Sequence, residues 1–176
     1  MGISKNLVIV HNPQWAYFNS KGSSYLGEKA QELKVSIKEW IESLDKEGTL
    51  VFYTRDVRSI DDDFYSSNNT MCEVGSDDVR LQESLRGLEN TIINTARPDA
   101  TFRTPLLAMV SKYKIHKVFL VGVETHLSVL MTAHSLRNLG FDVSVVEPLT
   151  LSSDEYLHNA AIAIMADGLG VEIIGS

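Results

Sequence analysis

The segment "VFLVGVETHLSV", from Val118 to Val129, carries the residues best suited to chemistry. An apolar run ends at Gly122, turns through Glu-Thr-His, and leads into a helical pattern whose first turn contains Ser128. Turns from strand to helix are where parallel α/β proteins place their ligands. Ser128 is therefore a candidate nucleophile, because the helix dipole and nearby backbone N–H groups would stabilise a developing oxyanion.

A serine nucleophile also needs a base within hydrogen-bond reach, because its hydroxyl is hardly ionised at neutral pH. His126 is the nearest histidine in the sequence, but residues i and i+2 of a helical turn point in different directions. The segment also lacks the G-x-S-x-G pattern of a nucleophile elbow. The residues alone therefore favour Ser128 as a first-turn helix residue whose hydroxyl is bonded locally.

Further candidates follow the other apolar runs, since ligands of an open parallel sheet bind beyond the carboxyl ends of its strands. They are His11 and Asn12, Arg55 and Asp56, Arg97 and Asp99, and Glu147. The remaining histidines, at positions 116, 134 and 158, are expected to be structural or surface residues. The five histidines show no ligand spacing, and the acidic run at 61–63 lacks the glycine and glutamate of a calcium loop. We therefore expect no metal and no cofactor.

Short apolar runs that could position these residues alternate with helical patterns along the chain. The runs lie at 7–11, 49–53, 91–93, 117–121, 143–146 and 171–174, and most lack polar alternation. Such runs are typical of parallel strands covered on both faces. The pattern predicts a three-layer α/β/α sandwich around a mostly parallel, Rossmann-like sheet of about six strands. Residues 1–176 are expected to form one domain.

Four helical patterns connect these runs. The first spans about 26–44, the second about 104–112 with Pro105 in its first turn, and the third follows the opening segment to about Gly140. The fourth begins with a capping-box signature, Ser152 followed three residues later by Glu155. The irregular stretch at 55–78 is interpreted as an excursion above the sheet, either a lid or binding loop or a solvated connection.

The composition limits the partners of the chain. Sixteen basic and 23 acidic residues give a formal charge of −7 without a basic cluster, which argues against nucleic acid and anionic membrane. No apolar run approaches the ~20 residues that span a bilayer. The single cysteine, Cys72, cannot form an internal disulfide, which indicates a reducing compartment, with the cytoplasm as the default expectation.

The motif from Gly122 to Val129, "GVETHLSV", followed by Thr132-Ala133, resembles the signature of the isochorismatase-like cysteine hydrolases. That signature is a strand, then G-x-x-T-x-x-C-V, then T-A on the helix. The stretches "LVIVHNPQWAYF", "FYTRDV", "ARPDATFRTPLLAMV" and "GFDVSVVEPLTLSSDEYLHNAAI" extend the likeness over nearly the whole chain. The resemblance implies that family's hydrolase fold and a cleft at the carboxyl edge of the sheet.

The three catalytic positions implied by this resemblance carry other residues. Asn12 occupies the position of the general-base aspartate, and Ser128 occupies the position of the cysteine. Arg97 occupies the position of the lysine, or Ala96 does if the alignment slips by one. An asparagine amide cannot accept a proton at neutral pH, and arginine does not give one up. Serine is a poor replacement for a thiolate without a base. The sequence thus predicts a degenerate triad.

The resemblance implies an oxyanion pocket, whereas the metal site of nicotinamidases is expected to be lost. Asp56 matches the metal-binding aspartate of nicotinamidases, but Arg58 occupies the place of the first histidine, so neither zinc nor iron is expected. The bond between the residues matching Val123 and Glu124 is a cis peptide in the family. The expected pocket residues are Val123, Glu124, Thr125, His126, Trp15 and Tyr17.

Three functions remain open at this point. The first is a degenerate family member, homo-oligomeric, that binds a small carboxylate or amide. The second is an active hydrolase of a small amide, carbamoyl or vinyl-ether substrate that uses a rearranged site of His11, Glu124, His126 and Ser128. The third is a non-catalytic oligomeric scaffold with an inert pocket.

Overall fold

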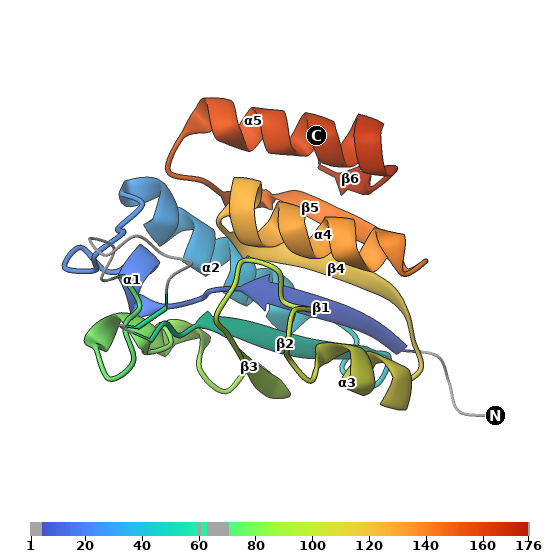
Figure 1. The fold of residues 1–176 in the computed structure, drawn as a ribbon, viewed down its shortest axis with the longest axis horizontal. Coiled ribbons are helices and arrows are strands. Elements are labelled where there is room, and N and C mark those ends of the chain that lie inside the picture. The colour runs from blue at the N-terminus through green and yellow to red at the C-terminus, as the bar shows by residue number, and fades with distance from the viewer. Residues whose placement is uncertain (1–4, 60, 63–70, 176) are drawn as a thin grey trace.

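A computed structural model of the chain describes residues 5–59, 61–62 and 71–175. The described strands form one six-stranded parallel sheet in the order β3-β2-β1-β4-β5-β6 (Figure 1). The strands are β1 (Lys5–His11), β2 (Thr49–Asp56), β3 (Thr91–Thr95), β4 (Ile115–Val123), β5 (Asp142–Leu151) and β6 (Glu172–Ile174). The predicted α/β fold is confirmed, and the sheet is entirely parallel.

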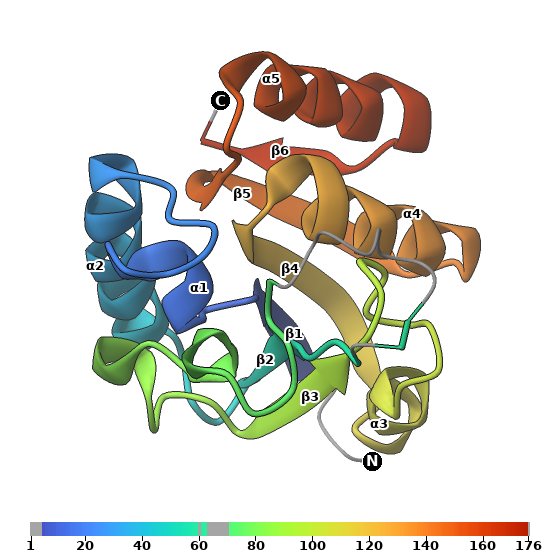
Figure 2. The same cartoon turned by 60° about the vertical axis from the view of Figure 1, so that its left-hand side comes forward.

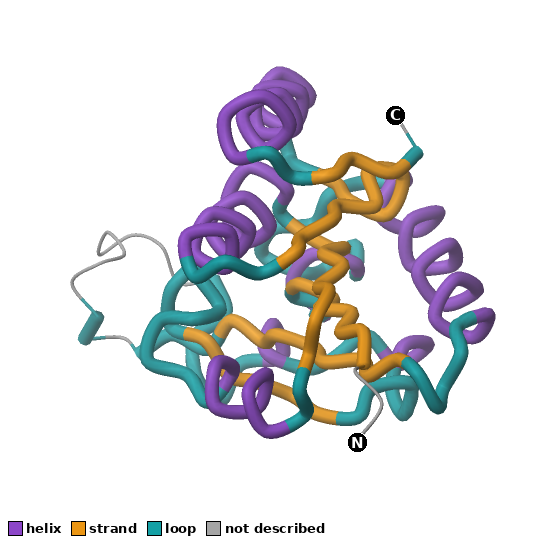
Figure 3. Tube along the Cα trace, turned by 90° about the vertical axis from the view of Figure 1, so that its right-hand side faces the viewer, coloured by secondary structure: helices purple, strands orange, loops and turns teal. Residues whose placement is uncertain are grey.

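Helices cover both faces of this sheet, as the tube drawing shows (Figure 3). The α-helices are α1 (Trp15–Phe18), α2 (Glu28–Ser43), α3 (Leu106–Lys112), α4 (Leu130–Asn138) and α5 (Glu155–Ala163). Short 3₁₀ helices lie at Asp77–Val79 and Glu83–Leu85, and π-helical turns at Thr125–Val129 and Ile164–Gly168. Among the described residues, no helix is both long enough and apolar enough to cross a membrane.

The core has two halves because alternate residues of each strand point to opposite faces. On β1, Leu7 and Ile9 belong to the cluster that packs against α3, α4 and α5, whereas Val8 and Val10 face α1 and α2. All four side chains are at most 1% exposed. Burial on both faces explains why the strand sequences lack polar alternation.

Strands β1 and β4 lie at the centre of the sheet, where the strand order reverses direction (Figure 2). Such a switch point opens a crevice at the carboxyl edge. The register pairs His11 with Gly122, so the residues that follow each strand emerge side by side. Asn12 and the turn that carries Ser128 are brought together by this register.

Two helix starts differ from the sequence expectation. Pro105 precedes α3 and is not part of its first turn. Asp154, not Ser152, caps α5, because its side chain accepts a hydrogen bond from the N–H of Leu157 at 2.9 Å. The predicted capping box is therefore wrong: Ser152 lies too far from the first turn, and its hydroxyl is bonded to His126.

Candidate functional site at the carboxyl edge of the sheet

Asn12 and Ser128 meet beyond the carboxyl ends of β1 and β4. Asn12 has a left-handed backbone, with φ of 48°, a conformation that asparagine tolerates better than most residues. Its Nδ2 donates to the Ser128 Oγ at 3.0 Å and to the Val123 carbonyl at 2.9 Å, and its Oδ1 accepts from the Thr54 hydroxyl at 3.1 Å. Both ends of the amide are thus engaged, and the group that faces Ser128 is a donor.

His11 does not take part in this contact. Its ring is fully buried, and Nδ1 lies 3.3 Å from the Thr54 Oγ1, while Nε2 has no hydrogen-bond partner among the described residues. Desolvation lowers the pKa of His11 from 6.5 to about 3. The ring is therefore neutral at physiological pH.

This burial predicts an acid-labile fold. In the unfolded chain His11 takes up a proton near pH 6.5, whereas the folded chain resists protonation down to about pH 3, so stability falls as the pH drops through this window. The loss attributable to His11 should reach roughly 2 kcal/mol by pH 5. Urea unfolding at pH 8 and pH 5 measures it, with His11→Asn as the comparison because asparagine does not titrate. An equal pH dependence in the two proteins would contradict the prediction.

Arg97 has its described hydrogen bonds outside the Asn12–Ser128 pair. Its Nη1 forms an ion pair with the Asp62 carboxylate and donates to the Ala96 carbonyl at 2.6 Å. Among its contacts with the described residues, no hydrogen bond joins it to Asn12 or Ser128. The Arg97 guanidinium is thus engaged by the segment that follows β2, and its place as the counterpart of the family's lysine stays a prediction.

Side chains of the turn after β4 form hydrogen bonds with the segment between β5 and α5. The Val123–Glu124 peptide bond is cis, as the resemblance implied. The Glu124 Oε2 accepts from the backbone and hydroxyl of Ser153 at 2.9 and 2.7 Å, and His126 Nδ1 lies 3.0 Å from the Ser152 Oγ. The described contacts of the His126 ring are therefore with Ser152 and, at 3.8 Å, with the Glu124 carboxylate.

His158 contacts the turn after β4, a contact that the sequence reasoning missed. Its Nδ1 lies 2.9 Å from the Oγ1 of the fully buried Thr125, and its Nε2 lies 3.9 Å from the Glu147 carboxylate. Burial lowers the pKa of His158, while Glu147 and Glu155 oppose this effect. The available signal was its position: His158 is the fourth residue of a helix that begins at the carboxyl edge of the sheet.

Asp56 and Arg58 form a buried ion pair at the end of β2. Arg58 donates from Nε and Nη2 to the Asp56 Oδ2 at 2.9 and 2.7 Å, and both side chains are at least 91% buried. Burial raises the pKa of Asp56, and the Arg58 hydrogen bond opposes this rise. These residues do not fit the metal site of nicotinamidases, because a guanidinium already neutralises the carboxylate. The described residues contain no group of three metal-ligating side chains.

The two aromatic residues expected to line the pocket have different environments. Tyr17 is 3% exposed, and its pKa is raised, chiefly by burial and further by Cys72, Asp56 and Glu124. It therefore lies beside the Asp56–Arg58 pair as a neutral phenol. Trp15 is half-buried, and the Arg80 guanidinium lies 5.9 Å from its ring centre.

Two hollows flank Arg97 and Phe102. The first, which we name the arginine pocket, has a volume of about 340 Å³ and is lined by Asn94, Thr95, Arg97, Phe102, Arg103 and Thr104 among others. The second, the α4 groove, has about 530 Å³ and is lined mainly by Phe102, Leu127, Met131 and His134. The arginine pocket is polar and has two arginines and the Asp62 carboxylate in its lining, whereas the α4 groove is largely apolar.

The structure is that of a parallel α/β protein in which an amide donor and a hydroxyl meet at the carboxyl edge of the central strands. A family model for the isochorismatase domain matches residues 6–176. The chain belongs to the isochorismatase family.

Solved structures agree with this assignment at the level of the fold. A nicotinamidase from Bacillus subtilis is 20% identical, with a TM-score of 0.84 over 97% of this chain and 99% of the other. An isochorismatase-like hydrolase from Alkaliphilus metalliredigens is 15% identical, with a TM-score of 0.87 over 97% and 94%. PnC1 from L. infantum, in complex with nicotinate, is 20% identical, with a TM-score of 0.86 over 99% and 94%. A comparison with curated protein sequences found no match.

Proposed function

We propose that this chain is a catalytically silent isochorismatase-family protein that binds a small carboxylate or amide. The observation that carries the first half is the Asn12–Ser128 hydrogen bond, in which the amide Nδ2 donates to the serine Oγ at 3.0 Å. A general base must accept a proton from its nucleophile, and an amide nitrogen has no lone pair available for this. The opposite end of the amide, Oδ1, is occupied by Thr54.

The other groups that could act as a base for Ser128 have their described contacts with other residues. The rings of His11, His126 and His158 have their described contacts with Thr54, Ser152 and Thr125, respectively. Glu124 accepts both of its hydrogen bonds from Ser153. The rearranged hydrolase built from His11, Glu124, His126 and Ser128 would therefore need each group to leave its present partner.

The arginine pocket supports the second half of the proposal. Arg103 supplies positive charge beside the Arg97–Asp62 ion pair, and Asn94, Thr95 and Thr104 supply amide and hydroxyl groups. Charge-assisted hydrogen bonds from guanidinium suit a carboxylate, and the side-chain amide suits a carboxamide. Phe102 provides an apolar wall for the body of the ligand.

The catalytic half is tested by turnover. Purified protein should release no ammonia from nicotinamide, and Ser128→Ala should behave identically, because the serine lacks a base. Isochorismate and N-carbamoyl compounds extend the test to the other reactions of the family. Turnover that Ser128→Ala abolishes would overturn the proposal in favour of the rearranged hydrolase.

The binding half is tested by thermal unfolding with nicotinate, nicotinamide and benzoate. A ligand at ten times its Kd stabilises the folded state by about 1.4 kcal/mol, which raises the Tm of a chain of this size by roughly 3–5 °C. Arg103→Gln should remove the shift, whereas Arg86→Gln, at an exposed position before β3, should preserve it. No shift with any of these compounds would favour the inert scaffold.

A further inference from the structure

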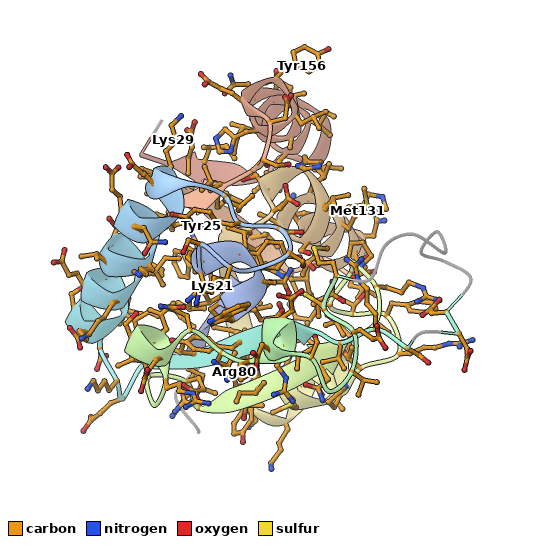
Figure 4. All side chains as sticks on the ribbon, turned by 90° about the vertical axis from the view of Figure 1, so that its left-hand side faces the viewer. Lys21, Tyr25, Lys29, Arg80, Met131 and Tyr156 are labelled. Carbon is orange, nitrogen blue, oxygen red and sulfur yellow. The ribbon has the colours of Figure 1, made fainter. Side chains whose placement is uncertain are left out.

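Five buried residues at the carboxyl edge of the sheet form a continuous hydrogen-bond network, which we name the Asn12 network. Its members are Val123, Ser128, Asn12, Thr54 and His11. Each of them is at most 8% exposed, whereas surface side chains such as Tyr156 project into solvent (Figure 4). Because water has little access to these residues, their polar atoms depend on one another for hydrogen bonds.

The Val123 carbonyl fixes the direction of the Asn12 amide. A carbonyl oxygen can only accept, so the amide atom that lies 2.9 Å from it must be the nitrogen. The two hydrogens of this nitrogen then point to the Val123 oxygen and, at 3.0 Å, to the Ser128 Oγ. The amide oxygen therefore faces Thr54. Because that oxygen carries no hydrogen, the Thr54 hydroxyl must donate to it, at 3.1 Å.

The Thr54 hydroxyl in turn fixes the tautomer of His11. A hydroxyl has one hydrogen and two lone pairs, and the hydrogen is already used by the Asn12 Oδ1. One lone pair accepts from the backbone N–H of Asn12 at 3.1 Å, and the His11 Nδ1 lies 3.3 Å from the same oxygen. The Nδ1 atom must therefore carry the hydrogen of the neutral ring. Nε2 is left with a lone pair, and it has no hydrogen-bond partner among the described residues.

We infer that His11 and Thr54 are positioning residues that hold Asn12 as a hydrogen-bond donor to Ser128, with His11 kept as its Nδ1–H tautomer. The ring donates to Thr54, Thr54 donates to the amide oxygen, and the amide nitrogen donates to the serine. This role rests on the proposed function only through the Asn12–Ser128 contact, and it does not require that a ligand binds.

The network also sets what Ser128 can offer to a neighbouring molecule. The serine oxygen accepts from Asn12, so its own hydrogen is available to a group outside the network. A molecule that meets this hydroxyl must provide an acceptor, as a carboxylate or a carbonyl oxygen does. Ser128 is thereby a donor that selects for such an oxygen, and it is not a nucleophile that waits for a base.

Nitrogen NMR of the full-length wild-type chain tests the tautomer. A nitrogen–proton correlation spectrum of the imidazole rings at pH 7 should show the His11 hydrogen on Nδ1 and none on Nε2, and His11→Asn identifies these signals by their loss. Thr54→Val should speed the exchange of this hydrogen with solvent about 10-fold, because its acceptor is removed, whereas Thr54→Ser should keep the exchange slow. A hydrogen on Nε2 would overturn the inference, and this result does not depend on whether a variant folds.

A thiol at position 128 tests whether His11 and Thr54 act on the Asn12 amide. In Ser128→Cys the amide N–H should stabilise the thiolate and so favour alkylation by iodoacetamide. Adding Thr54→Val or His11→Leu should slow this reaction about 3- to 10-fold, the effect of one weakened hydrogen bond. Thr54→Ser and His11→Asn keep the hydroxyl and an N–H donor, and each should restore the rate. Cys72 contributes little, because it is buried and burial raises the pKa of its thiol.

The control is a threonine outside the network. Thr91→Val removes a hydroxyl from a half-buried position on β3 and should leave the alkylation rate of Ser128→Cys unchanged. Equal rates with valine and serine at position 54 would overturn the positioning role. Turnover of nicotinamide by a wild-type chain that holds the Nδ1–H tautomer would instead overturn the proposed silence, so the two failures are distinguishable.

Discussion

Replacing Gly122 with alanine is expected to destabilise the fold by roughly 2–6 kcal/mol, the sum of a backbone cost and a packing cost of about 1–3 kcal/mol each. Gly122 has φ of +101°, which favours glycine. A Cβ at this position would lie 2.3 Å from the carbonyl oxygen and 2.7 Å from the nitrogen of His11. These are backbone atoms of the paired central strand and cannot swing away as a side chain would.

The packing cost can be separated from the backbone cost with a second glycine. Gly140 also has positive φ, of +85°, but a Cβ added there would meet no atom within 4 Å, so Gly140→Ala should carry only the backbone cost. Urea unfolding followed by circular dichroism compares the two variants, provided that the m-values agree. Equal losses in the two variants would show that the close approach of β1 and β4 is unimportant.

Replacing Arg58 with methionine should cost about 3–5 kcal/mol at neutral pH, because it leaves the Asp56 carboxylate buried without its cation. The pKa of Asp56 should rise further in this variant, since desolvation would no longer be opposed. The folded state would then bind a proton more readily than the unfolded chain, so the penalty should shrink as the pH falls. Urea unfolding between pH 7 and pH 5 measures both effects.

The double replacement Asp56→Asn with Arg58→Met supplies the internal control. It removes both charges, and should recover most of the stability lost in Arg58→Met, because the buried charge is what costs energy. An exposed pair supplies the external control: Lys38→Met breaks a contact of 3.9 Å with Glu42 and should cost about 0.5 kcal/mol or less. A similarly small cost for Arg58→Met would mean that water reaches Asp56 and that the pair does not stabilise the fold.

Several features of the site followed from residue type and order alone. The apolar runs predicted the strands because period and polarity are local properties of the sequence. The motif from Gly122 to Val129 predicted the turn, and amide chemistry alone shows that Asn12 cannot accept a proton at neutral pH, wherever its side chain points. The family relationship is confirmed by the match over residues 6–176.

Other features depended on which segments meet in space. Arg97 could be assigned to the triad from its place after β3, yet its direction is decided by Asp62, 35 residues away in the chain. His158 looked like an ordinary helical residue, and its bond to Thr125 exists only because α5 starts beside the turn after β4. The spacing of Ser152 from Glu155 suited a capping box at the start of α5. In the structure the Ser152 hydroxyl contacts His126 instead, and Asp154 caps the helix.

The segment "VFLVGVETHLSV" shows both contributions. Its sequence determined a strand, a glycine-dependent turn and a helix start, because these depend on local backbone preferences and on apolar patterning. The sequence did not show which group the Ser128 hydroxyl meets. The pairing of His11 with Gly122 decides this, because it places the Asn12 amide nitrogen 3.0 Å from the serine oxygen. Hydrogen bonds between residues 116 positions apart are set by strand register, and register emerges only when the whole sheet packs.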